Sequence, residues 1–574
     1  MKLDQTSGLG GNWRSCARFT HAVALALALA LVLTCTAAVA APRTQTVCTI
    51  TVNSADEKMM FQRHLPAGKT RFVELVERGR PDWLAGACQS AVACDVLIIS
   101  GHYDGYNHFF SDQLENPEHL PVDELERVSC SDSCQGLFAQ LKEVHLYGCN
   151  TLNRAPQNKA GADVLRSLLR EGHSLKAAQQ LQRSLNAGHG ESSHDRMRQV
   201  FKDVPVIYGF SSLAPLGPVA AATLGGYFRS HGAREIGRGR ASAGLLRQFS
   251  PLGMSVAQGM SDQDPHAHVR QDVCRFVDDR LSDADRLGFV HQLLQRPIAQ
   301  SRVHLDRLER YASTLDETGQ HTAQMVLGLD LVAGDTDTRQ RFLAFARDAD
   351  QAEVSARMVK VAQQLGWLTE QERRHELAGL LGQVLQRPTV GTNEINLACT
   401  LNASRELDSH FGPGGPTAGP PAGPHSSLPH AAMRACLGSA QGHAHTLAAL
   451  LSPREADVAV AQDYLRHRPI ADAQDLRRLA TGISAMAPSS AQVRALETLG
   501  RHYVSDRTIT NRLLQLFVQT PSPEVQRAVA GVLIRADRRA LANPQLRATL
   551  VKHRHRSPPG DDMIDALIRR LEAS

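Results

Sequence analysis

The segments "CDVLIIS" (residues 94–100) and "VHLYG" (residues 144–148) decide the fold class of this chain. Each contains a short apolar run, which is the pattern of a strand buried on both faces. Two further strand candidates are "VCTITVN" (residues 47–53) and "VPVIYGFSS" (residues 204–212). Helix-like segments separate these four runs, and strands that alternate with helices form a mostly parallel sheet covered on both faces. The sequence therefore predicts an α/β domain over residues 46–230.

The helices expected in this domain are read from amphipathic spacing between the strands. The segment "AGADVLRSLLREG" is the clearest, because Gly172 follows its last apolar position and glycine commonly ends a helix. The predicted helical segments are residues 56–65, 70–79, 133–143 and 160–172.

Beyond Ala214 the strand patterns fade and helical periodicity continues to the end of the chain. The sequence predicts a helical region over 231–410, a Pro/Gly-rich linker over 411–430 and a second helical region over 431–574. Ser452 and Ser522 are expected N-caps, since each is followed by a proline at the first helical position. The recurring helices over 431–574 resemble HEAT-like repeats, and a plain helical bundle is the alternative.

The first forty residues have the composition of a secretory signal peptide. Basic residues precede the apolar run "AVALALALALVL", and "AVA" supplies small residues before a cleavage site after Ala40. The alternatives are an uncleaved membrane anchor, or a lipoprotein attached at Cys35. No later stretch is apolar enough to cross a membrane, so the mature chain is expected to be exported, to the periplasm or the medium, without a membrane span.

Charge and cysteine content narrow the function classes. The formal net charge of +5 falls by two when residues 1–40 are removed, and the only dense basic run is the short "VKHRHR". Nothing in this balance indicates a nucleic-acid partner. Of the eleven cysteines, nine follow the signal peptide, which is an odd number in an oxidising compartment.

The cysteine spacings leave the disulfide pairing open. Cys130 and Cys134 suit either a tight local disulfide or half of a metal site, but no second close pair exists, so no metal is expected. Cys399 and Cys436 flank the Pro/Gly-rich stretch and are suited to bridging it. We expect Cys149 to be the unpaired cysteine.

Two reactive side chains follow the two central strand candidates. His102 stands just beyond "CDVLIIS" and Cys149 just beyond "VHLYG", 47 residues apart. Neighbouring parallel strands place such residues at one edge of the sheet, where α/β proteins build their sites. An imidazole that accepts the thiol proton makes the nucleophilic thiolate available. Gly101 and Gly148 allow sharp turns and leave space for a substrate.

The segments "DVLIISGHYDG" and "VHLYGCNT" resemble the caspase-like cysteine peptidases of clan CD, most closely the bacterial CHAT-type members. The resemblance covers residues 46–229 and implies a caspase-like domain that cleaves a protein or peptide substrate without a cofactor. It also implies that His102 is the general base, that Cys149 is the nucleophile, and that backbone N–H groups near both form an oxyanion hole. Many members of this family have a glycine directly after the histidine, whereas this chain has Tyr103 at that position and its glycine at Gly105.

Several neighbours complete the predicted site. Tyr103, Gly105 and Gly148 are expected near the oxyanion hole, and the substrate-pocket candidates are Asp104, Asn150 and Ser211. The leading hypothesis is an exported cysteine endopeptidase whose helical region positions the substrate or regulates access to the site, and this region is also where a protein partner would bind. The alternatives are an inactive scaffold, in which Cys149 would be bridged to another cysteine, and an enzyme that uses the same dyad on a non-peptide acyl group.

Overall fold

The computed structural model describes residues 44–572, with residues 77–83, 106, 112–117, 132–133, 156–161, 189–191, 231, 266, 318–321, 413–426, 544 and 556–562 left out. The chain divides into two compact units. Unit 1 comprises residues 1–159 and 187–280, and unit 2 comprises residues 160–186 and 281–574. The predicted signal peptide lies outside the described residues. Within the described part of the chain, no helix has the length and apolar character needed to cross a membrane.

Unit 1 is built on a six-stranded sheet with the order β2-β1-β3-β7-β8-β9. The five strands from β2 to β8 are parallel, and β9 is antiparallel to β8. This confirms the predicted mostly parallel sheet. The strands are β1 (Gln45–Thr51), β2 (Thr70–Glu74), β3 (Val96–Ser100), β7 (Glu143–Tyr147), β8 (Val206–Phe210) and β9 (Met254–Ala257).

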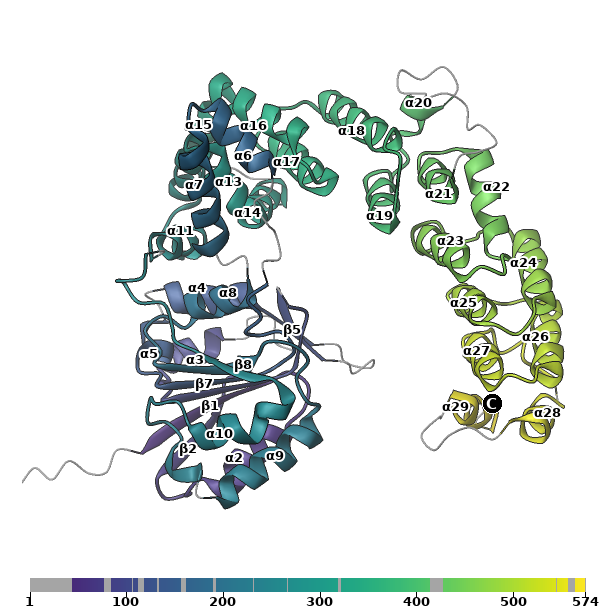
Figure 1. Cartoon of the computed structure of the whole chain (residues 1–574), viewed down its shortest axis with the longest axis horizontal. Helices are drawn as coiled ribbons and strands as arrows, with labels where there is room; N and C mark the ends of the chain where they lie inside the picture. The colour runs from purple at the N-terminus through teal and green to yellow at the C-terminus, as the bar shows by residue number, and fades with distance from the viewer. Residues whose placement is uncertain are drawn as a thin grey trace, which may run out of the picture. The chain divides into compact units, whose positions relative to one another are not determined.

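Helices cover both faces of this sheet, as Figure 1 shows. The central strands β3, β7 and β8 are buried at every position, because their side chains alternate between the two cores. One face carries α2 (Asp56–His64), α9 (Gly217–Arg229) and α10 (Ala243–Phe249). The other face carries α3 (Ala85–Gln89), α4 (Val122–Cys130), α5 (Gln135–Ala139) and α8 (Ser193–Val200).

A second, three-stranded antiparallel sheet follows β3 directly. It contains β4 (His102–Tyr103), β5 (His108–Phe110) and β6 (His119–Pro121). This small sheet was not predicted from the sequence. It matters for the site because its first residue is His102.

Two predicted boundaries differ from the structure. Residues 70–79 were expected to be helical, but Thr70–Glu74 is the edge strand β2. The α/β domain was expected to end at residue 230, yet unit 1 continues to Arg280 and includes β9 and α11 (Ala267–Val277). Pairing of β9 with β8 holds this extension to the sheet.

The helix predicted over residues 160–172 lies outside the α/β unit. It forms α6 (Ala162–Arg170), which lies in unit 2 together with α7 (Leu175–Gly188) up to Asn186. Arg166 of α6 donates to Asp350 at 2.7 Å, and the Asp163 N–H donates to the same carboxylate at 2.9 Å. These contacts fasten the segment to the helical unit.

The eight paired cysteines form four disulfides. Unit 1 contains Cys48–Cys94, Cys88–Cys134 and Cys130–Cys274, and unit 2 contains Cys399–Cys436. Cys130 and Cys134 therefore form neither of the arrangements considered from their spacing, because each is bonded to a cysteine on another helix. The Cys130–Cys274 bond joins α4 to α11. Four disulfides fit an exported protein.

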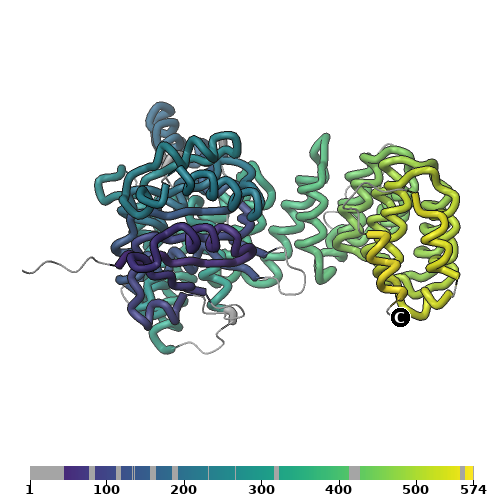
Figure 2. The backbone as a smooth tube through the Cα atoms, turned by 90° about the horizontal axis from the view of Figure 1, so that it is seen from below, coloured from purple at the N-terminus to yellow at the C-terminus, as the bar shows by residue number. Residues whose placement is uncertain are grey.

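Unit 2 is entirely helical in its described part. Toward the C-terminus the helices stack in two layers, because α23 packs on α25, α25 on α27 and α27 on α29, while α24 packs on α26 and α26 on α28 (Figure 2). Assignment of this stack to HEAT-like repeats stays a prediction. Besides α6 and α7, the helices are α12 (Asp283–Gln295), α13 (Ile298–Val303), α14 (Leu305–Glu317), α15 (Ala323–Gly334), α16 (Thr336–Asp348), α17 (Ala352–Gln364), α18 (Glu370–Leu385), α19 (Thr392–Leu401), α20 (Asp408–Phe411), α21 (Leu428–Cys436), α22 (Ala440–Ala449), α23 (Glu455–His467), α24 (Ala473–Ala485), α25 (Ser490–Leu499), α26 (Arg507–Gln519), α27 (Pro523–Leu533), α28 (Leu546–His553) and α29 (Met563–Glu572).

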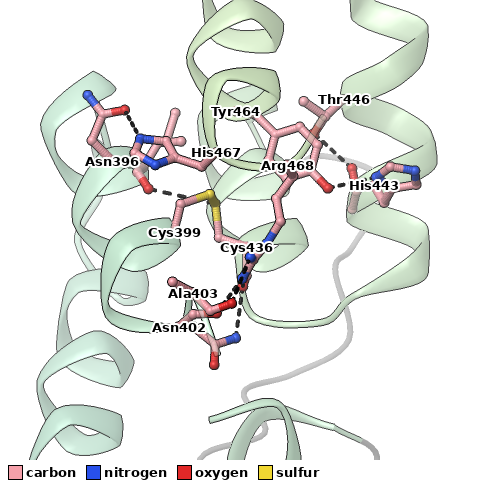
Figure 3. Close-up of a disulfide and its surroundings, with 12 residues drawn as sticks. Asn396, Cys399, Asn402, Ala403, Cys436, His443, Thr446, Tyr464, His467 and Arg468 are labelled. Carbon is pink, nitrogen blue, oxygen red and sulfur yellow. Dashed lines mark hydrogen bonds between the residues drawn. A yellow bond between two sulfur atoms is a disulfide. The ribbon is translucent and has the colours of Figure 1, made fainter. Parts of the chain in front are cut away.

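The Cys399–Cys436 disulfide ties α19 to α21 across the Pro/Gly-rich stretch, most of which lies outside the described residues. Figure 3 shows how the surrounding polar groups close the ends of both helices. Asn402 donates to the Cys436 carbonyl at 2.9 Å, and Arg468 donates to the carbonyls of Asn402 and Cys436. These polar groups satisfy helix-terminal carbonyls that would otherwise be unpaired.

Candidate active site

The ends of β3 and β7 meet at one edge of the sheet. Ser100 pairs with Tyr147 at the end of the parallel ladder, and the Gly101 N–H donates to the Tyr147 carbonyl at 3.3 Å. Gly148 has no space for a side chain, since a Cβ there would lie 2.8 Å from the Cβ of Tyr103 and 3.0 Å from the Gly101 carbonyl oxygen. The two backbones therefore touch at the glycines, immediately before His102 and Cys149.

Cys149 is half-buried, and it is the one free thiol among the cysteines that the structure describes. The Ala214 N–H donates to its Sγ at 3.3 Å. Asn150 adopts a left-handed conformation with φ of 59°, and its N–H donates to the Ser212 carbonyl at 2.7 Å. The thiol is thus held at a turn between β7 and the segment that follows β8. A peptide N–H directed at the sulfur stabilises negative charge there.

His102 begins the small sheet and is half-buried. Its ring lies 5.4 Å from the ring of Phe110, to which it is paired across β4 and β5. Tyr103, the next residue, is buried in the core, with its ring 4.7 Å from that of Phe109. Because successive strand residues face opposite sides, the tyrosine lies in the core behind the strand that carries the histidine.

Two side chains of α8 hold the loop after Tyr103 in place. The Ser193 hydroxyl donates to the carbonyl of Gly105, whose φ of 89° favours glycine. The buried guanidinium of Arg196 donates to the amide oxygen of Asn107 at 3.1 Å. These contacts fix the backbone just beyond His102.

Arg196 is held in turn by two carboxylates of α4. It donates to Glu126 at 3.0 Å and to Asp123 at 2.6 Å. Burial lowers the pKa of Arg196, but the two carboxylates outweigh burial, so the pKa lies above its ordinary value. No local pattern reveals this buried ion cluster, because Arg196 is about seventy residues from Asp123 and Glu126 in the chain.

The remaining predicted site residues lie on the turns around the strand ends. Asp104 accepts from the backbone N–H groups of Asn107 and His108 at 2.8 and 3.1 Å, so its carboxylate closes the loop after β4. The Asn150 side chain accepts from Asn153 at 3.2 Å. Ser211 is exposed at the end of β8, and its N–H donates to the Gly253 carbonyl at 3.4 Å.

A buried polar group lies next to the ends of β3 and β7 on the α2 face. Glu57 of α2 is buried, and its Oε2 has no hydrogen-bond partner among the described residues. Burial raises the pKa of Glu57 to about 7, while its own backbone N–H and the Ser100 hydroxyl oppose that shift. Burial also raises the pKa of the neighbouring Tyr147 phenol, to which Glu57 contributes. Neither group was singled out from the sequence, where both read as ordinary helix and strand residues.

The arrangement places an imidazole and a thiol on adjoining strand ends, with backbone N–H groups close by. Among the described residues, no cluster of three or more His, Cys, Asp or Glu side chains is suited to hold a metal ion. No protein-family model, curated protein or solved structure matches the chain.

Proposed function

We propose that the chain is an exported cysteine endopeptidase in which His102 is the general base and Cys149 is the nucleophile. The observation that carries the proposal is the pairing of β3 with β7, since these neighbouring parallel strands end in the segments that hold the two residues. The free state of Cys149, while the other described cysteines are bonded, supports the same role. The mostly parallel sheet with helices on both faces agrees with the caspase-like resemblance.

The proposed reaction proceeds through an acyl-enzyme. His102 accepts the proton of Cys149, and the thiolate attacks the carbonyl carbon of the scissile peptide bond. Backbone N–H groups of Cys149 and of the residues after His102 stabilise the oxyanion of the tetrahedral intermediate. The His102 imidazolium then gives its proton to the leaving amine. Water, deprotonated by His102, hydrolyses the thioester and restores the thiol.

Two observations on the chain bear on the alternatives. A scaffold with an inactive site predicts a disulfide at Cys149, and the free thiol favours the enzyme over that scaffold. The position of Tyr103 in the core also favours catalysis, because the bulky residue after the histidine does not take up room beside the imidazole. Binding of a substrate or protein partner by unit 2 belongs to the same proposal.

Activity in an oxidising compartment should depend on the redox state of the thiol. An exposed thiolate is converted to sulfenic acid or a mixed disulfide, which cannot attack a carbonyl. A mild thiol reductant is therefore expected to raise activity in preparations stored in air.

The direct test is peptide hydrolysis by full-length variants. Cys149→Ala is expected to abolish cleavage of a peptide library and labelling by a thiol-reactive probe. His102→Ala is expected to lower kcat by about 10²–10⁴-fold, which is the range for loss of a general base. His119→Ala is the matched control, since His119 is an exposed histidine of the same small sheet. Full cleavage by Cys149→Ala would disprove the proposal.

A further inference from the structure

Three large apolar side chains are exposed between the end of β8 and the first turn of α9. Leu213 is 77% exposed, Leu216 is 66% exposed and Val219 is 50% exposed. A single exposed leucine needs no explanation, but a group of apolar side chains in one short segment marks a binding surface. The segment "SSLAPLGPV" (residues 211–219) contains no charged residue.

This segment borders the thiol. The Ala214 N–H that donates to Cys149 Sγ belongs to the residue directly after Leu213. The Ser212 carbonyl, directly before Leu213, accepts from the Asn150 N–H. Leu216 follows Ala214 by two residues, a separation of at most about 7 Å along an extended chain. The backbone positions of both leucines are therefore within about 7 Å of the residue that contacts the proposed nucleophile.

The exposure of these side chains is imposed by a fixed backbone. Pro215 and Pro218 restrict the chain, since proline locks φ. Gly217 starts α9 against α2, and a side chain there would collide with Ser54 and Asp56. The apolar groups are therefore presented by an anchored backbone, and a backbone that is already ordered lowers the entropy cost of binding.

We propose that residues 213–219 form an apolar subsite, so that the preferred substrate is a peptide with a large aliphatic or aromatic side chain within about three residues of the scissile bond. This inference rests on the proposed function and names its substrate class. The bound side chain would remove Leu213 and Leu216 from water, which is favourable for an apolar group and not for a charged one. The segment offers no side chain of opposite charge to pair with an acidic or basic residue of a substrate.

The first experiment compares two peptides that differ at one position, leucine against serine, in cleavage by the full-length protein. The measured quantity is the ratio of their kcat/KM values. We expect the wild type to favour the leucine peptide, and Leu213→Ser combined with Leu216→Ser to reduce that ratio about tenfold. Leu331→Ser is the matched control, because Leu331 is 69% exposed on α15 of unit 2. Cleavage without an apolar preference, or a preference that survives the double substitution, would overturn the inference and leave the peptidase proposal standing.

A second experiment does not require catalysis. The rate at which Cys149 reacts with iodoacetamide is compared with its rate with N-hexyl iodoacetamide, which carries an apolar tail. The tailed reagent should react several-fold faster in the wild type and in Leu331→Ser, and this advantage should fall toward one in the double variant. Equal rates for the two reagents in the wild type would contradict the subsite. Equal rates are also the result expected if a second copy of the chain covers the two leucines, and the subsite would be wrong in that case too. If no peptide is cleaved but the tailed reagent keeps its advantage, the peptidase proposal fails and the apolar subsite remains.

Discussion

At the scale of single residues, Glu57 carries a carboxyl group that is buried near the ends of β3 and β7. Its carboxyl group lies beneath the ends of β3 and β7, where water is excluded and the charged form is disfavoured. Its pKa is about 7 in the folded chain, against an ordinary value of 4.5. The protonated form therefore predominates in the folded protein at mildly acidic pH, while the unfolded chain is ionised.

This difference predicts a pH-dependent stability. Between pH 4.5 and about 7 the folded state binds the proton and the unfolded state does not, so the free energy of unfolding falls as the pH rises. The loss from Glu57 is about 3 kcal/mol, and it is complete above pH 7. Glu57→Gln has no titrating group at this position and should not show this loss. The free energy of unfolding of Glu57→Gln minus that of the wild type should therefore be larger at pH 8 than at pH 5.

The measurement is urea unfolding of the full chain at pH 5 and pH 8, with amide exchange of β3 and β7 reporting the unfolding of unit 1. Glu353→Gln is the control, since Glu353 is exposed on α17. An equal difference between Glu57→Gln and the wild type at both pH values would contradict the account.

The sequence indicated His102 and Cys149 as candidates because each follows a short apolar run, a signal carried by adjacent residues. It missed Arg196, Ala214 and the leucines around it. Their importance comes from contacts between segments that are distant in the chain, and no local pattern records such contacts.

At the scale of elements, the site depends on close contact between two strand ends. Gly148 is in contact with Gly101 and Tyr103, and no larger residue fits there. Gly148→Ala is expected to destabilise unit 1 by about 1–3 kcal/mol, because the added methyl group must push the strand ends apart. The same shift moves Cys149 relative to His102, so peptide hydrolysis should fall by at least about tenfold even in protein that is folded.

Gly68→Ala is the matched control, because a Cβ at Gly68 meets nothing within 4 Å. Urea unfolding gives the stability change, and kcat at saturating peptide gives the effect on catalysis. Normal stability and activity in Gly148→Ala would show that the strand ends are not as close as described.

The buried strands were predictable and the edge strands were not. Strands β1, β3, β7 and β8 carry apolar runs because both faces are covered. The edge strand β9 is only partly buried and β2 has one exposed position, so neither carries a continuous apolar run.

One of the two predicted N-caps is present. Ser522 caps α27 as expected. The residue before α23 is Arg454 and not Ser452, and the Ser452 hydroxyl accepts from the Arg454 N–H.

At the scale of the whole molecule, the described cysteines form four disulfides and leave one free thiol, at Cys149. Among these cysteines, Cys149 is the one that can act as a nucleophile. The sequence predicted that Cys149 would be unpaired, and it indicated a bridge between Cys399 and Cys436 only as one that their positions suit. It did not predict the three pairs of unit 1, because connectivity depends on how strands and helices that are distant in the chain meet in space. The sequence also did not predict that residues 160–186 belong to unit 2, because this depends on their contacts with helices that are distant in the chain.

The measurement that tests the central claim most directly is acid-quench mass spectrometry of the full chain during reaction with an activated peptide ester. The account predicts an acyl group on the fragment that contains Cys149 within the first turnover, slower acylation in His102→Ala, and no acyl group on that fragment in Cys149→Ala. An acyl group on a different residue, or turnover of the ester without an adduct and undiminished in Cys149→Ala, would contradict it.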